Sequence, residues 1–247
     1  MDLTGRTILI TGASSGIGRE TALLLSQSNA RLILVARNRD RLEQTQAALE
    51  GPGHQVEVFD VTALDEIPAW IKGLVSRLGP LHGVVHSAGV FEVVPLRILT
   101  AAKLEEILRV NLSAALFLAR GFRQRGCHAD GASLVLLSSV AGLRGYAGLS
   151  AYTAGKSALL GVTKSLAVEL AGDGIRVNCV APGLVSTAMS TQVEEQTLRE
   201  NKGIESEYPL GIGLPRDVAN GIAFLLSDAS RWITGTTLMI DGGYCAH

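Results

Sequence analysis

Tyr152 and Lys156 are the residues whose types and spacing most directly suggest chemistry. They stand four residues apart in Tyr152-Thr-Ala-Gly-Lys156, a stretch typical of a helix, so both side chains point from one face. A nearby ammonium lowers the pKa of a phenol and makes it a usable acid near neutral pH. The same spacing also occurs on ordinary helix surfaces. The pair therefore indicates an acid site only if other segments supply a place for a cofactor.

A glycine-rich turn near the start of the chain supplies such a place. It follows an apolar run typical of a strand and opens a helical stretch. Glycines permit the tight turn and let backbone N–H groups approach a pyrophosphate at the helix N-terminus. The spacing Gly-x3-Gly-x-Gly differs from Gly-x-Gly-x2-Gly, the commonest dinucleotide-binding pattern. We predict that the pyrophosphate is bound by Gly12, Ser14, Ser15, Gly16, Ile17 and Gly18.

Two other motifs match part of this turn. A mononucleotide P-loop requires Lys-Ser/Thr after the glycines, and the sequence has none at that spacing. Gly12-Ala13-Ser14-Ser15-Gly16 also fits Gly-x-Ser-x-Gly, the nucleophile elbow of hydrolases. A hydrolase takes an oxyanion N–H from an earlier strand–helix loop, and this turn follows the first predicted strand. The dinucleotide interpretation is therefore preferred.

The end of the second predicted strand indicates which dinucleotide is bound. A carboxylate there hydrogen-bonds the ribose 2′-OH of NAD and repels the 2′-phosphate of NADP. The sequence has Ala36 at this place, followed by Arg37, whose guanidinium can pair with a phosphate. We predict NADP(H) as the cofactor, with NAD(H) as the weaker choice. The alternative for Arg37 is a solvated position at the start of a basic helix.

Composition excludes several classes of protein. The chain has 247 residues, 47% of them hydrophobic, and a net charge of −1, which gives no basic field for nucleic acid or an anionic membrane. No apolar run reaches the ~18 residues of a membrane span, and the first residues lead straight into a strand, which predicts no signal peptide. The three scattered cysteines indicate reduced thiols in a cytoplasm, and the five histidines lack metal-ligand spacing.

Short apolar runs alternate with longer amphipathic ones along the whole sequence. This alternation predicts an α/β fold: a doubly wound parallel sheet of about seven strands with helices on both faces, in one domain over 1–247. The predicted strands are Thr7–Thr11, Arg31–Ala36, Gln55–Phe59, Gly83–His86, Ser133–Ser138, Arg176–Val180 and Thr237–Ile240. The predicted helices lie near 16–28, 39–50, 63–78, 101–124, 151–171 and 215–227.

The polar segment 187–209 interrupts this alternation. An excursion of that length in an α/β domain is often a substrate loop, although a solvated surface helix fits its composition as well. The pocket beside it is expected to be mainly apolar, with Val140, Leu143 and Tyr146 in its wall.

Together these residues resemble the short-chain dehydrogenase/reductase family over essentially the whole chain, and in particular its 3-oxoacyl-acyl-carrier-protein reductase-like members. The glycine turn resembles the family's TGxxxGxG, Tyr152 and Lys156 its YxxxK, and Asn178-Cys-Val-Ala-Pro182-Gly183 its NxxxPG. The resemblance implies a Rossmann fold in which Ser139 and Asn111 join Tyr152 and Lys156 as catalytic residues. It also implies cofactor contacts from Tyr152, Lys156, Asp60, Val61, Ala88, Gly89, Pro182, Gly183, Val185 and Thr187.

The sequence departs from the family pattern in two places. The family usually has Asn-Asn-Ala-Gly where this chain has His86-Ser87-Ala88-Gly89, and a packed histidine is expected in place of the first Asn. Family members that act on an acyl-carrier protein tend to carry basic residues where Asp130 and Asp173 appear here. If those two carboxylates flank the active-site mouth, they repel an acidic carrier protein.

The resemblance implies a mechanism for carbonyl reduction. Tyr152 protonates the carbonyl oxygen, Lys156 lowers the tyrosine pKa and holds the nicotinamide ribose, and Ser139 donates a hydrogen bond to the developing alkoxide. Asn111 holds a water near Lys156, either through its side chain or through a backbone carbonyl freed by a local kink in the helix.

We therefore expect an NADP(H)-dependent oxidoreductase that interconverts a carbonyl and a secondary alcohol on a small, mainly apolar substrate. The alternatives are a 3-oxoacyl-acyl-carrier-protein reductase of fatty acid synthesis and, more remotely, a non-catalytic NADP(H) sensor. The helices at 101–124 and 151–171 carry apolar residues on more than one face, which predicts pairing across a two-fold axis in a homotetramer or a homodimer.

Overall fold

The computed structural model describes residues 1–187 and 204–246. In this part of the chain seven parallel strands form one sheet in the order β3-β2-β1-β4-β5-β6-β7. The strands are β1 (Thr7–Thr11), β2 (Arg31–Ala36), β3 (Gln55–Val58), β4 (Leu81–His86), β5 (His128–Leu137), β6 (Arg176–Pro182) and β7 (Thr237–Ile240). The predicted fold class, a doubly wound parallel sheet of the Rossmann type, is confirmed.

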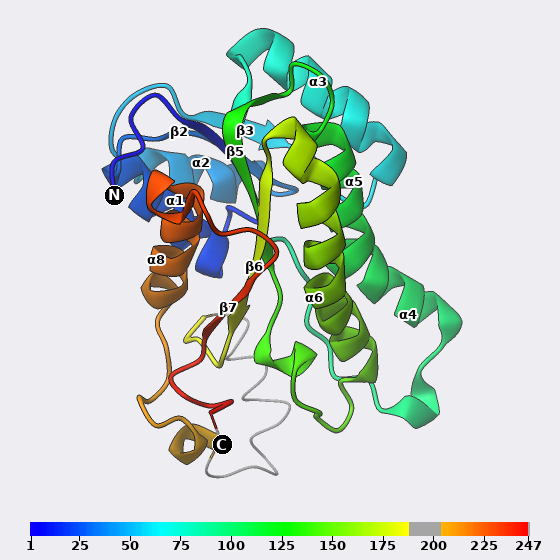
Figure 1. Cartoon of the computed structure of the whole chain (residues 1–247). Coiled ribbons are helices and arrows are strands. Elements are labelled where there is room, and N and C mark those ends of the chain that lie inside the picture. The colour runs from blue at the N-terminus through cyan, green and yellow to red at the C-terminus, as the bar shows by residue number, and fades with distance from the viewer. Residues whose placement is uncertain (188–203, 247) are drawn as a thin grey trace.

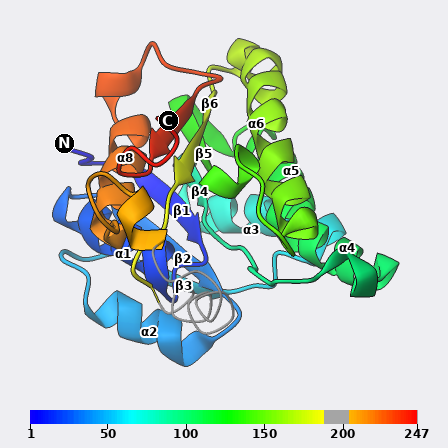
Figure 2. The same cartoon turned by 90° about the horizontal axis from the view of Figure 1, so that it is seen from below.

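Helices cover both faces of the sheet (Figures 1 and 2). One face packs against α1 (Gly16–Gln27), α2 (Arg39–Ala47) and α8 (Pro215–Leu226), and the other against α3 (Ile67–Leu78), α5 (Ala114–Phe122) and α6 (Ser150–Leu170). α4 (Ala101–Leu108) runs along α6. Neighbouring strand residues alternate between the two layers: Ile8 and Ile10 lie in the first hydrophobic core, and Leu9 lies in the second.

The strand order reverses between β1 and β4, which are neighbours in the sheet although two strands separate them in sequence. Their connections leave in opposite directions, so a crevice opens at the carboxyl ends of these two strands. The glycine turn follows β1 and His86-Ser87-Ala88-Gly89 follows β4. The topology therefore brings these two motifs to one edge of the sheet.

The predicted helix at 101–124 is interrupted. Between α4 and α5 lies a π-helical turn, Arg109–Ser113, called the π-turn below. The N–H of Ala114 donates to the carbonyl of Arg109, five residues back, and so does not occupy the carbonyl of Val110. Periodicity does not reveal such a turn, because one extra residue leaves the apolar pattern on either side intact.

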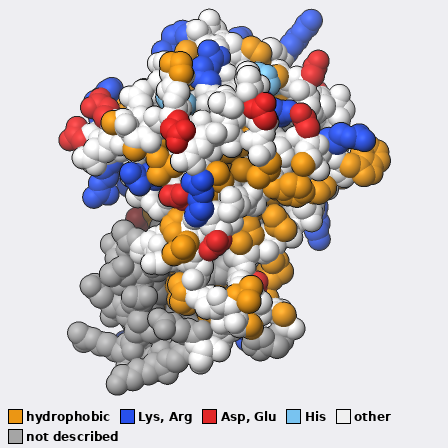
Figure 3. Space-filling view, turned by 90° about the vertical axis from the view of Figure 1, so that its left-hand side faces the viewer, with side chains coloured by type: hydrophobic (Ala, Val, Ile, Leu, Met, Phe, Trp, Pro, Cys, Tyr) orange, Lys and Arg blue, Asp and Glu red, His pale blue; other side chains and the backbone are white. Residues whose placement is uncertain are grey.

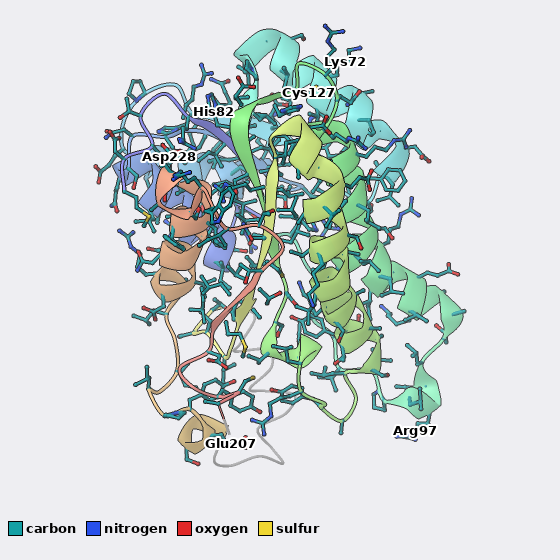
Figure 4. The ribbon with its side chains drawn as sticks, viewed as in Figure 1. Lys72, His82, Arg97, Cys127, Glu207 and Asp228 are labelled. Carbon is teal, nitrogen blue, oxygen red and sulfur yellow. The ribbon has the colours of Figure 1, made fainter. Side chains whose placement is uncertain are left out.

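The expected position of Asp130 and Asp173 at the active-site mouth is wrong within this chain. β5 begins at His128, five residues before the predicted start, so Asp130 lies near the amino end of that strand. Asp173 precedes β6 and pairs with Arg123 at 2.7 Å. Cys127, just before β5, lies at the opposite end of the molecule from Glu207 in Figure 4. The repulsion expected against an acidic carrier protein therefore has no basis in the geometry of one chain.

Most of the predicted substrate loop, 188–203, lies outside the described residues. Its flanks are described: Thr187 stands at the end of the segment after β6, and Tyr208 follows a short 3₁₀ turn at Ile204–Glu207.

Candidate active site

A cavity of 670 Å³ lies at the carboxyl ends of the strands from β3 to β6. Most of the predicted site residues line it: Gly12, Ser14, Ser15, Gly16, Ile17, Arg37, Asp60, Val61, Ala88, Gly89, Ser139, Tyr152, Lys156, Pro182, Gly183, Val185 and Thr187. Gly18 and Asn111 do not line the cavity. Both pack behind residues that line it. Residues from seven separate segments of the chain thus share one cavity.

The glycine turn is packed too tightly for side chains. Gly12 has φ +70°, and a Cβ there would lie 2.8 Å from the backbone nitrogen of Ala88. A Cβ on Gly18 would collide with the carbonyl oxygen of Gly12. The absence of these two side chains lets the N-terminus of α1 approach the loop after β4, and it leaves the cavity open over the turn. This cradle fits the pyrophosphate of a dinucleotide.

Two arginines line the end of the cavity beyond β2. Arg37 follows the strand, and Arg41 lies in the first turn of α2, whose N-terminus is capped by the Asn38 side chain accepting from the Arg41 N–H. Neither guanidinium has a partner among the described residues. Arg39 between them pairs with Glu43 and does not line the cavity. The sequence prediction singled out Arg37 and gave Arg41 no role.

Asp60 and Val61 follow β3 at the same end of the cavity. One carboxylate oxygen of Asp60 accepts from the N–H and the hydroxyl of Thr62, at 2.9 and 2.8 Å, which fixes the turn. Phe59 also lines this wall and stacks on Trp70, with ring centroids 4.1 Å apart. The end of the cavity where an adenosine would lie is thus lined by the polar turn at Asp60 and by the aromatic ring of Phe59.

Ser139 and Tyr152 are in contact at the other end of the cavity. Ser139 caps the 3₁₀ turn Val140–Gly142 after β5. Its hydroxyl accepts from the N–H of Ala141 at 3.1 Å and is hydrogen-bonded to the phenol of Tyr152. Burial raises the pKa of Tyr152 to about 12, although the Ser139 hydrogen bond acts to lower it. Lys156 does not contribute to this shift, so its predicted role in lowering the tyrosine pKa stays a prediction. The phenol stays protonated at neutral pH, as a proton donor must.

Lys156 is buried beside Tyr152. Its ammonium lies 5.7 Å from the centre of the Tyr152 ring and donates to the carbonyl of Leu137 at 2.8 Å. Burial lowers its pKa from 10.5 to about 8. Ser138, the neighbour of Ser139, turns away from the phenol and donates to the backbone carbonyl of Lys156. The lysine is therefore held at both its backbone and its ammonium.

Asn111 lies fully buried in the π-turn. Its side-chain amide makes two bonds to the backbone of Val90, donating to the carbonyl and accepting from the N–H, both at 2.9 Å. A Cβ on Gly89 would lie 3.1 Å from the Asn111 amide oxygen and 3.4 Å from the Lys156 ammonium nitrogen. Of the two expected ways for Asn111 to hold a water, the side chain is occupied. The backbone of the π-turn is the part that remains available.

The segment after β6 is fixed by a tyrosine that the sequence prediction did not single out. The Tyr208 hydroxyl accepts from the N–H of Leu184 at 3.0 Å, and a Cβ on Gly183 would lie 2.8 Å from the Tyr208 ring. Tyr208 stacks on Tyr244, with centroids 4.4 Å apart, and Arg144 lies over the Tyr244 ring at 4.4 Å. No local pattern signals this contact, because it joins residues far apart in sequence.

The wall opposite the catalytic groups is mainly apolar and aromatic. Phe91 meets the Tyr152 ring edge-on, with centroids 5.0 Å apart, and Tyr146 packs beside both. Val140 lines this wall as expected, whereas Leu143 is 47% exposed and does not line the cavity. Among described residues on this side, Lys156 is the one charged side chain that lines the cavity. A neutral substrate fits this environment.

The described residues contain neither a metal-binding cluster nor a membrane-spanning helix. No group of three or more metal-ligating side chains is placed to hold an ion there. No helix of the described part is both long and apolar enough to cross a membrane.

Similarity to known proteins covers nearly all of the chain. A protein-family model described as enoyl-(acyl carrier protein) reductase matches residues 12–245. The chain is 36% identical to short-chain dehydrogenase/reductase aba4 of Botryotinia fuckeliana, over 98% of this chain and 97% of that protein. It is also 36% identical to 3-oxoacyl-[acyl-carrier-protein] reductase FabG of Thermotoga maritima, over 98% and 99%.

Solved structures with the same fold have a similar degree of identity. A short-chain dehydrogenase/reductase of Brucella melitensis, described as a glucose/ribitol dehydrogenase, superposes with a TM-score of 0.91 at 30% identity over 99% of each chain. A Beutenbergia cavernae protein, described as an NAD(P)-dependent gluconate 5-dehydrogenase with bound NADP at low occupancy, has a TM-score of 0.90 at 30% identity, over 100% and 99%. These relatives have different described activities on one shared fold.

Proposed function

Because this chain belongs to the short-chain dehydrogenase/reductase family, a family of oxidoreductases, we propose that it is an NADP(H)-dependent reductase of a small, neutral, mainly apolar ketone. The observation that carries the proposal is the shared cavity. Ser139 and the buried Tyr152 and Lys156 lie at one end of it, and two arginines without a partner among the described residues lie at the other. We also propose that residues 1–247 form one domain and that 187–209 contributes the substrate loop.

The residues around the cavity fit NADPH. Gly12 and Gly18 leave backbone room for a pyrophosphate, and Arg37 and Arg41 offer two guanidiniums to a 2′-phosphate. When bound, the cofactor supplies the hydride that reduces the carbonyl carbon. The protein supplies position, a proton and the exclusion of water.

Tyr152 gives its proton to the carbonyl oxygen as the substrate becomes an alcohol. Its raised pKa keeps the phenol protonated until transfer, and the Ser139 hydroxyl stabilises negative charge that develops on either oxygen. Lys156, with a pKa lowered to about 8, exchanges protons near neutral pH more readily than an ordinary lysine. Lys156 then returns a proton to Tyr152 and is itself reprotonated through a water held by the π-turn backbone.

A turnover assay tests the proposal. Purified protein is mixed with NADPH and, in turn, cyclohexanone, 1-phenyl-1,2-propanedione, ethyl acetoacetate and free acetoacetate, and loss of NADPH absorbance is recorded. We expect turnover with at least one neutral ketone and a lower kcat/KM for the anion, because a carboxylate finds no partner on the apolar wall. A protein that binds NADPH but turns over none of them, nor any carrier-bound substrate, is a cofactor sensor.

Reduction of 3-oxoacyl groups on an acyl-carrier protein is the second candidate. Relatives named FabG are 32% to 36% identical to this chain over 98% of its length. The reacting end of a 3-oxoacyl thioester is neutral and fits the same wall. A large preference for the carrier-bound thioester over its free N-acetylcysteamine analogue would establish this function.

Loss of the two arginines is expected to weaken NADPH binding selectively. Arg37→Ala should cost roughly 1.5–3 kcal/mol, the range of a charge-assisted hydrogen bond, and Arg41→Ala a similar amount, with NADH binding nearly unchanged. Ala36→Asp with Arg37→Ile should invert the preference. Fluorescence titration with each cofactor measures these effects.

Arg39→Ala is the matched control, since Arg39 lies in the same turn but pairs with Glu43 outside the cavity. It should leave both affinities unchanged. Equal losses for NADPH and NADH in the Arg37 and Arg41 variants would show that those side chains are structural.

We propose that the chain assembles into a homotetramer, with a homodimer as the second choice. Leu108, Phe117, Leu160 and Leu166 on α4, α5 and α6 stay partly exposed, and Val168 on α6 is 82% exposed. Figure 3 shows another side of the molecule, the left-hand side of Figure 1 with α1 and α8, where hydrophobic side chains gather across the middle and right. Light scattering should give about four times the chain mass of 26.0 kDa.

Two leucine variants locate the contact in that assembly. Leu116→Lys, at a position 39% exposed on α5, should reduce the assembly size. Leu96→Lys, at an even more exposed position in the 3₁₀ turn Leu96–Ile98, should not. A monomer at micromolar wild-type concentration would refute the tetramer.

A further inference from the structure

His86 occupies a buried position between two parts of the candidate site. It ends β4, is 1% exposed, and lies where strands β1 and β4 are adjacent in the sheet. Its Nδ1 lies 2.9 Å from the hydroxyl of Thr11, the residue before the glycine turn. Its Nε2 lies 3.2 Å from the carbonyl oxygen of Val110, in the π-turn.

These partners fix the proton on the ring. A carbonyl oxygen can only accept, so Nε2 carries the hydrogen and donates to Val110. Nδ1 then accepts from the Thr11 hydroxyl, and the Thr11 oxygen in turn accepts from the N–H of Ala88 at 3.2 Å. Burial, and next the charge of Lys156, lower the pKa of His86 to about 4, which agrees with a neutral ring.

The bond to Val110 is made where the helical hydrogen-bond pattern changes. In a regular helix the Val110 carbonyl would accept from the N–H of Ala114, but that N–H bonds to Arg109. His86 supplies a donor to this partly buried carbonyl. The same turn aims the Asn111 amide at the backbone of Val90, one residue beyond Gly89 and close to Lys156.

We propose that His86 is a positioning residue that holds the π-turn through its Nε2–H and the glycine turn through its Nδ1. It thereby couples the proton-relay side of the cavity to the cofactor side. The kinetic effects expected of this coupling rest on the proposed function. The structural coupling itself does not. The residues concerned are Thr11, His86 and Val110, together with Asn111, which the π-turn carries.

Two isosteric variants separate the two bonds. A glutamine amide reaches the place of Nε2, so His86→Gln keeps a donor for Val110 and loses the acceptor for Thr11. An asparagine amide reaches the place of Nδ1, so His86→Asn keeps the acceptor and loses the donor. Asparagine is also common at this position in the short-chain dehydrogenase/reductase family, so the His86→Asn variant is expected to fold.

We expect the two variants to fail in different ways. His86→Asn should lower kcat about ten-fold with the KM for NADPH nearly unchanged, as expected for loss of one buried hydrogen bond. His86→Gln should raise the KM for NADPH about ten-fold with kcat nearly unchanged, and Thr11→Val should behave like it.

Amide hydrogen exchange in the cofactor-free protein gives a readout that does not depend on activity. The N–H groups of Val90 and Ala114 should exchange about ten-fold faster in His86→Asn and at the wild-type rate in His86→Gln. Equal exchange and equal kinetic losses in the two variants would overturn the proposal. If the wild type turns over no substrate, the proposed function fails, and exchange together with NADPH titration still decides the role of His86.

Discussion

Tyr152→Phe is expected to lower kcat by at least about 10³-fold, because it keeps the buried ring and removes the transferable proton. NADPH affinity should change little, since the ring still packs against Phe91 and no charge is lost. Steady-state kinetics with the best neutral ketone, together with a cofactor titration, measure both quantities.

Tyr244→Phe is the control for the loss of a buried phenol hydroxyl. Tyr244 is 3% exposed and stacks on Tyr208, but it does not line the cavity. Its variant should keep kcat within about three-fold of wild type. A Tyr152→Phe enzyme that retains more than a tenth of the wild-type rate would rule out Tyr152 as the proton donor.

Lys156→Met should abolish turnover, weaken NADPH binding and yet make the cofactor-free protein more stable below pH 8. Burial lowers the pKa of Lys156 from 10.5 to about 8, and each pKa unit corresponds to about 1.4 kcal/mol, so the charged form costs roughly 3 kcal/mol in the folded state. Removing the ammonium also leaves the Leu137 carbonyl without its donor, which reduces the gain in the free energy of unfolding by about 1 kcal/mol. The net gain is expected to be about 2 kcal/mol.

The pH dependence of this gain follows from the direction of the shift. Between pH 8 and 10.5 the unfolded chain holds the lysine proton and the folded chain releases it, so wild-type stability rises with pH in that window. The advantage of Lys156→Met is therefore greatest below pH 8 and shrinks towards pH 10.5. Urea unfolding at pH 7 and pH 10 measures the difference between the two proteins.

Lys164→Met gives a matched control on the same helix, because Lys164 is exposed. It should change neither activity nor stability by more than about 0.5 kcal/mol. A Lys156→Met protein that is less stable than wild type at pH 7 would show that the buried ammonium is stabilising.

The sequence predicts the sheet well because parallel strands buried on both faces are continuous apolar runs. β1, β2 and β7 match the predicted ranges. β5 begins at His128, before its predicted start, because the first residues of the strand are mostly polar and give no apolar run. The interruption at Arg109–Ser113 could be anticipated only as a possible kink. It coincides with the contact of His86 with Val110, which joins residues 24 apart in sequence.

In the candidate site, too, local sequence predicts some features, and contacts between distant residues decide the others. Short motifs predict which residues reach the cavity, since the carboxyl ends of parallel strands meet at one edge of the sheet. They do not predict the pKa of Tyr152, because its burial depends on Phe91 and Tyr146, which neighbour it only in the fold. Arg41 and Tyr208 were missed for the same reason: each reaches the cavity from a turn whose direction the local pattern does not give.

Transfer of deuterium from [4-²H]NADPH to a neutral ketone tests the central claim most directly. The cofactor carries the label on the face that is transferred, each face being tried in turn, and the product alcohol is analysed by mass spectrometry. The account predicts one deuterium on the carbinol carbon per NADPH consumed, a much slower reaction with labelled NADH, and loss of transfer in Tyr152→Phe. Unlabelled alcohol, or equal transfer by Tyr152→Phe and wild type, would contradict it.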